Sequence, residues 1–292
     1  MSPLKSTLAL WQRQLGRGSV RFLVYSVLIL WTAITLFGFT WVVLTSLKSN
    51  RELFTIKSIW GLPEVLQWEN YVRAWTRSKM GNFLLNSALV STASVLLINL
   101  VGSMAAYVLA RFRFAGNRLI LGGFILGSAI PLQLITVPLY LMFNDLGLLD
   151  SLVGLTMVYV AVSLPFTVFV LTGFFKSIPT ALEEAAVLDG ASEYGVFWHV
   201  MLPLAAPGVT TVTIFNFLGV WNEYLLALML INETDKMTIP LGLYNLQVVQ
   251  EYAADFTGLF AGFVIMLLPT ILAFIFLQER ISRGMTVGAL KG

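Results

Sequence analysis

The chain has no cysteine and only one histidine, His199, among its 292 residues. Without cysteine there is no disulfide framework, no thiol nucleophile and no cysteine-bound metal. A single histidine excludes a paired-histidine zinc motif and leaves a serine–histidine mechanism with one badly placed base. We therefore expect no catalytic residue and no metal site, and we interpret His199 as a polar loop residue.

Charge is also scarce, since Asp, Glu, Lys and Arg make up 11% of the residues and hydrophobic residues make up 58%. This composition is typical of membrane proteins. No G-x-x-x-x-G-K-[ST] phosphate-binding motif occurs, so we expect this chain to bind no ATP and no other cofactor. We interpret the formal net charge of +3 as a signal of membrane orientation and expect no nucleic-acid binding.

Six long apolar stretches are each sufficient to cross a hydrocarbon core about 30 Å thick. Lipid requires each span to be helical, because unpaired backbone groups cannot remain in hydrocarbon. We therefore predict an all-α, polytopic membrane protein, with a segment at 1–21 and a single transmembrane domain over 22–292. The predicted spans are 22–47, 83–110, 119–143, 151–175, 204–231 and 256–278.

The distribution of basic residues predicts the orientation, because cytoplasmic segments accumulate Lys and Arg. The N-terminal segment, the 111–118 connection and the C-terminal tail are basic, which places both termini in the cytoplasm. The first span is too long for a signal-peptide core and has no clear cleavage site, so we expect it to be retained. The basic 48–82 loop is an exception, because alternation of the spans places it outside.

Inside the predicted spans the ionisable side chain is Glu223, in the stretch NFLGVWNEYLL. Ion-driven pumps thread several acids, bases or histidines through the bilayer. A single glutamate is poorly suited to passing protons or ions across the bilayer. We therefore expect any energy for transport to enter from outside the membrane domain.

The connection 176–203, cytoplasmic by this orientation, contains the acid-rich segment EEAAVLDG at 183–190. Thr180 followed by Glu183 fits a capping box, in which both side chains bond free N–H groups of the first helical turn. Gly190 can take the left-handed conformation that ends a helix. We predict one short helix over 181–189 and a second near 193–200. The first helix either rests on lipid headgroups or docks into a partner protein; its acidity disfavours an anionic leaflet.

Several residues of this connection stand in a characteristic order: Glu184-Ala185-Ala186, Gly190, Val200 and Leu202-Pro203. The pattern resembles the EAA loop of ATP-binding-cassette importer permeases, with Val200 where isoleucine is usual. Further similar segments are ENY at 69–71, YVLARFRFAGN at 107–117, WNEY at 221–224 and RGMTVGALKG at 283–292. Over most of its length the chain is similar to carbohydrate-uptake permeases of the maltose-permease type.

The resemblance implies a type I importer permease with six membrane helices, located in a bacterial cytoplasmic (inner) membrane. It implies a second, related permease, two ABC ATPase subunits that bind ATP and Mg, and an extracytoplasmic substrate-binding protein. The implied solute is a sugar or an oligosaccharide.

The resemblance also implies that the EAA helix sits in a cleft of one ATPase and couples its closure to the permease. Glu184 and Asp189 would make polar contacts, Ala185 and Ala186 would permit close approach, and Gly190 would set the bend. The full set of expected coupling residues is Glu183, Glu184, Ala185, Ala186, Asp189, Gly190, Val200, Leu202 and Pro203.

The candidates for the solute path lie in the fifth predicted span. Helical spacing puts Asn216, Gly219 and Glu223 on one face. The full candidate set is Asn216, Trp221, Asn222, Glu223 and Tyr224. Aromatic faces beside amide and carboxyl groups suit a sugar, but polar groups also join helices within membranes, and tryptophan also anchors helices at the interface. Both interpretations stay open.

The predicted outer loop contains MTIPLGLYNLQ at 237–247. In relatives of the maltose type the corresponding loop projects into the binding protein. By this resemblance Tyr244, Asn245 and Gln247 are candidates to contact that protein.

Small residues and prolines predict helix packing and helix shape. Gly102-x-x-x-Ala106 and Gly123-x-x-x-Gly127 permit close contact between helices. Prolines should kink the spans that contain them. These prolines are Pro131, Pro138, Pro165 and Pro269.

Three alternatives remain beside a sugar importer. A glycerol-phosphate-type solute is the nearest, although an anion would require basic groups in the path. An ion-coupled secondary transporter needs a coupling-ion site, which carbonyls and hydroxyls can form without acids. An intramembrane hydrolase needs a nucleophile and a base in facing spans, which a single loop histidine disfavours.

Overall fold

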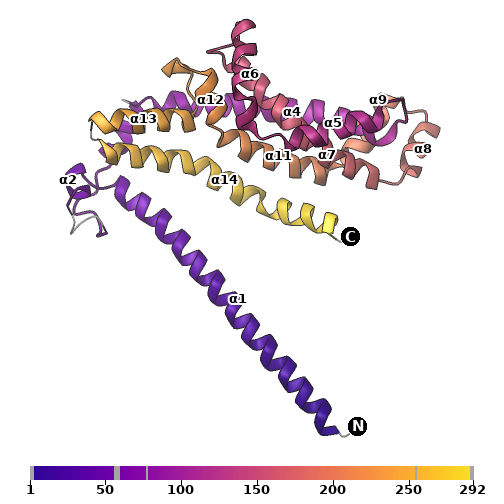
Figure 1. Cartoon of the computed structure of the whole chain (residues 1–292), viewed down its shortest axis with the longest axis horizontal. Coiled ribbons are helices and arrows are strands. Elements are labelled where there is room, and N and C mark those ends of the chain that lie inside the picture. The colour runs from indigo at the N-terminus through magenta and orange to yellow at the C-terminus, as the bar shows by residue number, and fades with distance from the viewer. Residues whose placement is uncertain (1–2, 56–59, 77, 254, 290–292) are drawn as a thin grey trace. The chain divides into compact units, whose positions relative to one another are not determined.

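The computed structural model describes residues 3–55, 60–76, 78–253 and 255–289. Within these ranges every regular element is a helix (Figure 1), which confirms the all-α fold class. The chain divides into two compact units, Met1–Tyr71 with Ala254–Val264, and Val72–Ala253 with Ile265–Gly292. Each unit is described separately.

The first unit contains α1 (Pro3–Ser46), α2 (Asn50–Leu53) and the start of α3 (Glu69–Thr76). Residues 20–40 of α1 are all exposed, and most of them are apolar. Such a surface suits lipid or another membrane helix. The end of α1 is fixed by Asn70, whose side-chain amide donates to the carbonyl oxygens of Ser46 and Lys48, each at 2.8 Å.

The second unit has a core of three packed helices, α4 (Met80–Arg111), α7 (Leu152–Ser177) and α11 (Ala206–Trp221), visible in Figure 1. Small residues allow α4 and α7 to approach each other. A Cβ atom built on Gly102 would lie 2.7 Å from Cγ2 of Thr167, and Ala106 is fully buried. The predicted close contact at Gly102-x-x-x-Ala106 is confirmed. At Gly123-x-x-x-Gly127, a Cβ atom built on Gly127 would lie 3.6 Å from Cγ of Pro165, whereas one built on Gly123 would have no neighbour within 4 Å.

Three of the predicted spans match single apolar helices within three residues: Val20–Ser46, Met80–Arg111 and Leu152–Ser177. The third predicted span is two helices, α5 (Asn117–Ala129) and α6 (Leu132–Asp145), bent by 103°. The bend lies at Pro131, because proline lacks an N–H group and forces Ile130 out of the helical conformation. The described part of the sixth predicted span includes the apolar helix Phe256–Leu272. The number of spans and the orientation of the termini stay predictions.

The fifth predicted span is also interrupted, so a continuous helix to residue 231 is wrong. Helix α11 ends at Trp221, and α12 (Leu225–Leu230) follows after a break. The carboxylate of Glu223 accepts bonds from the N–H groups of Leu226 at 2.8 Å and Ala227 at 3.2 Å. A side chain that binds the backbone in this way begins a new helix.

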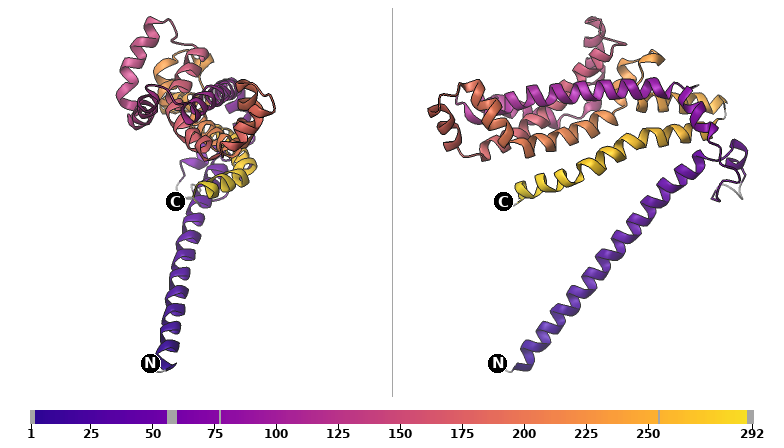
Figure 2. Two further views of the ribbon diagram at one scale, coloured as in Figure 1. Left: turned by 90° about the vertical axis from the view of Figure 1, so that its right-hand side faces the viewer. Right: turned by 180° about the vertical axis from the view of Figure 1, so that it is seen from behind.

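The remaining elements are α8 (Ala181–Leu188), α9 (Glu193–Val196), a π-helix (Phe197–Met201), α10 (Leu202–Leu204), a 3₁₀ turn (Thr234–Lys236), α13 (Ile239–Ala253) and α14 (Phe256–Ala289). Helices α8 and α9 lie at the end of the second unit where α4 and α7 end, as Figures 1 and 2 show. The predicted outer loop, 232–255, is largely helical, because it contains the 3₁₀ turn and α13. The first half of this segment is held in place because the Ile239 and Leu241 side chains are buried.

Candidate functional site

Helix α8 is the predicted coupling helix, and its bounds agree with the prediction. It begins after Thr180 and ends at Leu188, and Gly190 follows with a φ of +86°, in the left-handed region. The predicted capping box is wrong. Thr180 itself has a helical conformation, and its side chain makes no capping bond. Its carbonyl oxygen instead accepts the N–H groups of Glu183 and Glu184.

The carboxylate of Glu183 is paired with Arg111, the last residue of α4. The Arg111 Nε and Glu183 Oε1 atoms are 3.0 Å apart, and the two side chains are 9% and 18% exposed. The Arg111 Nη2 group also donates to the carbonyl oxygen of Ile178 at 2.6 Å. Burial raises the pKa of Glu183, and the charge of Arg111 opposes that rise. The pair ties the first turn of α8 to the end of a core helix.

Ala186 faces the same direction as Glu183 and packs against the core of the second unit. The other side of α8 is open, with Glu184, Ala185 and Asp189 exposed. Leu188 is 88% exposed, although it is a large apolar residue. Leu182 and Val187 of the same helix are exposed as well, and exposed apolar surface of this kind marks sites where another protein can bind.

The segment after α8 forms the predicted second helix, with one difference. Ser192 caps α9 by accepting the N–H of Gly195 at 3.2 Å. The helix then continues as a π-helix through His199, which is exposed as expected for a polar loop residue. Val200 and Leu202 are half-buried, whereas Pro203 is exposed. Leu202 packs against the core of the second unit, whereas Pro203 belongs to the outer surface of the loop.

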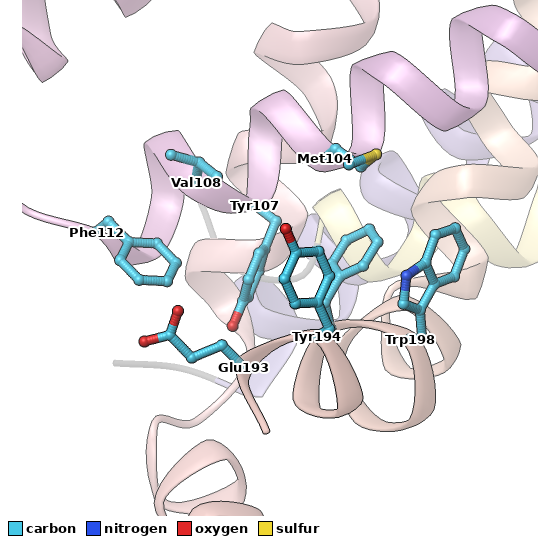
Figure 3. A pocket seen from close by; sticks show the side chains of 8 residues that line it. Met104, Tyr107, Val108, Phe112, Glu193, Tyr194 and Trp198 are labelled. Atoms are coloured by element: carbon cyan, nitrogen blue, oxygen red, sulfur yellow. The ribbon is translucent and has the colours of Figure 1, made fainter. Parts of the chain in front are cut away.

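A cleft of about 230 Å³ lies beside this loop, between the end of α4 and the α9 segment (Figure 3). The Tyr107 and Phe197 rings are buried there, with centroids 5.2 Å apart. Tyr194 and Trp198 are 76% and 42% exposed. The cleft is lined by Met104, Tyr107, Val108, Phe112, Glu193, Tyr194, Phe197 and Trp198. Aromatic faces beside one carboxylate suit an apolar or cationic side chain of a partner.

The candidates in the fifth span differ in their burial and in their partners. The Asn216 amide is buried and donates to the Thr167 hydroxyl at 2.9 Å. The Glu223 carboxylate accepts the Tyr159 hydroxyl at 2.8 Å. Both side chains therefore join helices, while Asn222 is exposed. Thr167 and Tyr159 both belong to α7, so Asn216 and Glu223 bond the same neighbouring helix although α11 ends between them at Trp221.

The structure brings together two candidates that the sequence assigned to different roles. The rings of Tyr224 and Tyr244 have centroids 6.1 Å apart, and the two side chains are 47% and 43% exposed. Gln247 is exposed and Asn245 is half-buried on the same helix, α13. Trp221 is only 4% exposed and stacks on Phe217, so it belongs to the packed interior.

Two polar residues with clear structural roles were missed by the sequence reasoning. Arg111 was interpreted only as an orientation signal, although its place at a helix end was compatible with an ion pair. Asp150 has a positive φ of 51°, and its carboxylate accepts the N–H groups of Asn232 and Glu233. Burial raises the pKa of Asp150, but these two bonds, the side-chain amide of Asn232 and the charge of Lys236 together outweigh burial, and the pKa lies below its ordinary value. In the described residues, no group of three or more His, Asp or Glu side chains is placed to hold a metal ion.

Comparisons with known proteins identify the family. Residues 98–287 match the family described as "Binding-protein-dependent transport system inner membrane component". The chain is 40% identical over 267 residues to the diacetylchitobiose uptake system permease protein NgcG of Streptomyces coelicolor, covering 91% of this chain and 88% of that protein. It is 37% identical over 273 residues to the sulfoquinovosyl glycerol transport system permease protein SmoH of Agrobacterium fabrum, covering 94% of each.

The fold is similar to a solved structure as well. A chain of a bacterial ABC transporter involved in the import of the acidic polysaccharide alginate superimposes with a TM-score of 0.77 and 23% identity, covering 89% of this chain and 96% of that chain. This likeness shows the importer permease fold. The chain therefore belongs to the family of binding-protein-dependent transport system inner membrane components, as a multi-pass permease of the inner membrane.

Proposed function

We propose that this chain is the permease subunit of an ATP-driven importer that takes up a sugar or an oligosaccharide delivered by a binding protein. The observation that carries the proposal is the similarity to two uptake permeases for glycosidic solutes, at 40% and 37% identity over 91% and 94% of this chain. The proposed complex contains a second permease, two ABC ATPase subunits and an extracytoplasmic binding protein. ATP and Mg belong to the ATPase subunits, since this sequence has no phosphate-binding motif.

The outward side of α8 is the proposed docking surface for one ATPase. Glu184 and Asp189 supply charges, and Ala185 allows close approach, because all three are exposed. Gly190 lets the chain turn back immediately after the helix. When the ATPase subunits close on ATP, a push on α8 reaches α4 through the Arg111–Glu183 pair. Coupling then requires both a docking surface and an internal connection.

The solute path is proposed to pass the exposed side chains that follow α11. Asn222 can bond sugar hydroxyls, and the Tyr224 and Tyr244 rings can stack on sugar C–H faces. Asn245 and Gln247 lie on the same helix as Tyr244 and are proposed to contact the binding protein. Asn216, Trp221 and Glu223 are assigned to the scaffold of the path.

A sugar or an oligosaccharide is favoured over a glycerol-phosphate-type solute, because a phosphate would be stabilised by cations in the path. The segment 206–230, which includes α11 and α12, contains no Lys or Arg.

Replacing Glu184 by alanine in the reconstituted importer tests the coupling role. We expect binding-protein-stimulated ATP hydrolysis to fall at least about tenfold, since a docked, charge-assisted contact contributes roughly 1.5–3 kcal/mol. Glu64, an exposed acid of the 48–82 loop, is the matched control, and Glu64→Ala should retain coupling. Unchanged coupling in Glu184→Ala would contradict the assignment.

Affinity purification of the chain in mild detergent tests the proposed assembly. We expect a second permease and a Walker-motif ATPase to co-purify. Their binding protein then identifies the sugar through its ligand. A chain that purified alone and catalysed ion-dependent uptake in liposomes would overturn the importer.

A further inference from the structure

A second cavity, of about 760 Å³, lies where the end of α4, the start of α5 and the end of α7 meet. Three cations, Arg113, Arg118 and Lys176, line it together with apolar side chains, and it has no acidic residue. We call this cavity the basic pocket.

The three cations of the basic pocket have no partner among the described residues. All three are exposed, and they make no ion pair or hydrogen bond within the ranges that the structure covers. The neighbouring Arg111 behaves differently, because it is bound to Glu183 and to the carbonyl oxygen of Ile178. Three like charges that share one pocket repel one another unless an anion lies between them.

The turn that carries two of these cations has a fixed shape. The Asn117 side-chain amide donates to the carbonyl oxygens of Phe112 at 2.8 Å and Leu109 at 3.2 Å. Gly116 has a φ of +92°, which a residue with a side chain rarely adopts. Arg113 and Arg118 are therefore held on either side of a constrained turn.

The rim of the basic pocket is apolar and exposed. Phe112, Phe114 and Leu119 are 40%, 43% and 80% exposed. These side chains adjoin the ends of α4 and α7, which are long and apolar enough to cross a membrane. In a bilayer such a rim would face acyl chains, and the cations would stand at headgroup level. By the predicted orientation this is the cytoplasmic side, where the leaflet is anionic.

We propose that the basic pocket binds the phosphodiester headgroup of an anionic phospholipid. The headgroup phosphate lies between Arg113, Arg118 and Lys176, and its acyl chains run along the apolar rim. An ATPase subunit fits this surface less well, because the exposed aromatic rim suits hydrocarbon. Free phosphate would satisfy the cations but would leave the rim uncovered.

Native mass spectrometry of the full chain, released from micelles that contain phosphatidylglycerol or phosphatidylcholine, tests the proposal. We expect the chain to retain phosphatidylglycerol selectively. A basic residue near an anionic headgroup contributes about fivefold in affinity. Retention should therefore fall about fivefold in Lys176→Gln and about a hundredfold when Arg113→Gln, Arg118→Gln and Lys176→Gln are combined.

Two control variants separate the pocket from general charge and from folding. Arg21→Gln removes an exposed cation on the same predicted side of the membrane and should retain the lipid. The charge-conserving combination of Arg113→Lys, Arg118→Lys and Lys176→Arg should retain most of it. Equal retention of both lipids, or displacement by excess inorganic phosphate, would overturn the proposal. So would a combined glutamine variant that keeps the lipid but loses a co-purifying ATPase.

Discussion

Replacing Arg111 by methionine should destabilise the chain through the carboxylate that it leaves behind. Removing one partner of a fully buried ion pair costs about 3–5 kcal/mol, because the remaining charge is buried without compensation. The Arg111 and Glu183 side chains are 9% and 18% exposed, so some solvent reaches the pair. We expect a loss of about 2–3 kcal/mol in the free energy of unfolding for this less buried pair.

The double variant provides the sharper test. Replacing a buried pair by apolar residues of similar volume is often nearly neutral. Arg111→Met combined with Glu183→Leu should therefore be more stable than Arg111→Met alone. Intrinsic tryptophan fluorescence during thermal unfolding of the purified full chain measures both variants. The single variant should melt roughly 4–12 °C lower, at about 2–4 °C for each kcal/mol.

The pH dependence of the single variant has a definite sign. Arg111 opposes the rise that burial causes in the pKa of Glu183, so that pKa rises further without Arg111. A raised pKa in the folded state means that the protonated form is favoured there. The contribution of Glu183 to stability is then fully present below its unfolded pKa of about 4.3 and is lost as the pH rises through the raised value.

Two results would refute this reasoning. If Arg111→Met melts at the temperature of the unchanged chain, the pair contributes nothing measurable. If the double variant is as unstable as the single variant, the loss comes from the bond between Arg111 and Ile178 and not from an unpaired charge.

Other perturbations test other contacts. Gly102→Ala should cost about 1–3 kcal/mol by overpacking against Thr167. Adding Thr167→Ser should restore the melting temperature, because serine lacks the close methyl group but keeps the hydroxyl. If the melting temperature does not recover, the strain lies elsewhere. Asp150→Ala should cost about 0.5–1.5 kcal/mol, because two exposed backbone N–H groups exchange the carboxylate for water. Because the pKa of Asp150 is lowered in the folded state, Asp150 contributes to stability above its unfolded pKa of about 3.9, and this contribution is lost as the pH falls through the lowered value. A difference in melting temperature between the variant and the unchanged chain that does not depend on pH would contradict this. Glu223→Gln should lower the melting temperature yet leave substrate preference in uptake unchanged, whereas a changed preference would return Glu223 to the solute path.

The features predicted correctly from the sequence depend on local chemistry. Long apolar stretches locate helices because lipid leaves the backbone no alternative, and three spans agree within three residues. The short helix α8 lies between Pro179 and Gly190, and Gly190 follows its end in the left-handed conformation that closes a helix.

The features that the sequence did not predict depend on partners distant in the chain. Glu183 fits a capping box locally, but Arg111, 72 positions earlier, takes its carboxylate. Glu223 was assumed to lie within a helix, yet it begins a new one and bonds Tyr159. In each case the local pattern allowed two partners for a polar group, and the packing of α4, α7 and α11 selected one.

The Arg111–Glu183 pair also has a mechanical consequence. A flexible joint between α8 and α4 would absorb a force as local bending, and little of the stroke would reach the far end of the core. The pair and the bond to Ile178 instead clamp α8 against the end of a 32-residue helix. Under the proposed coupling, helix α4 acts as a stiff rod, which transmits a displacement of α8 from its Arg111 end over its whole length.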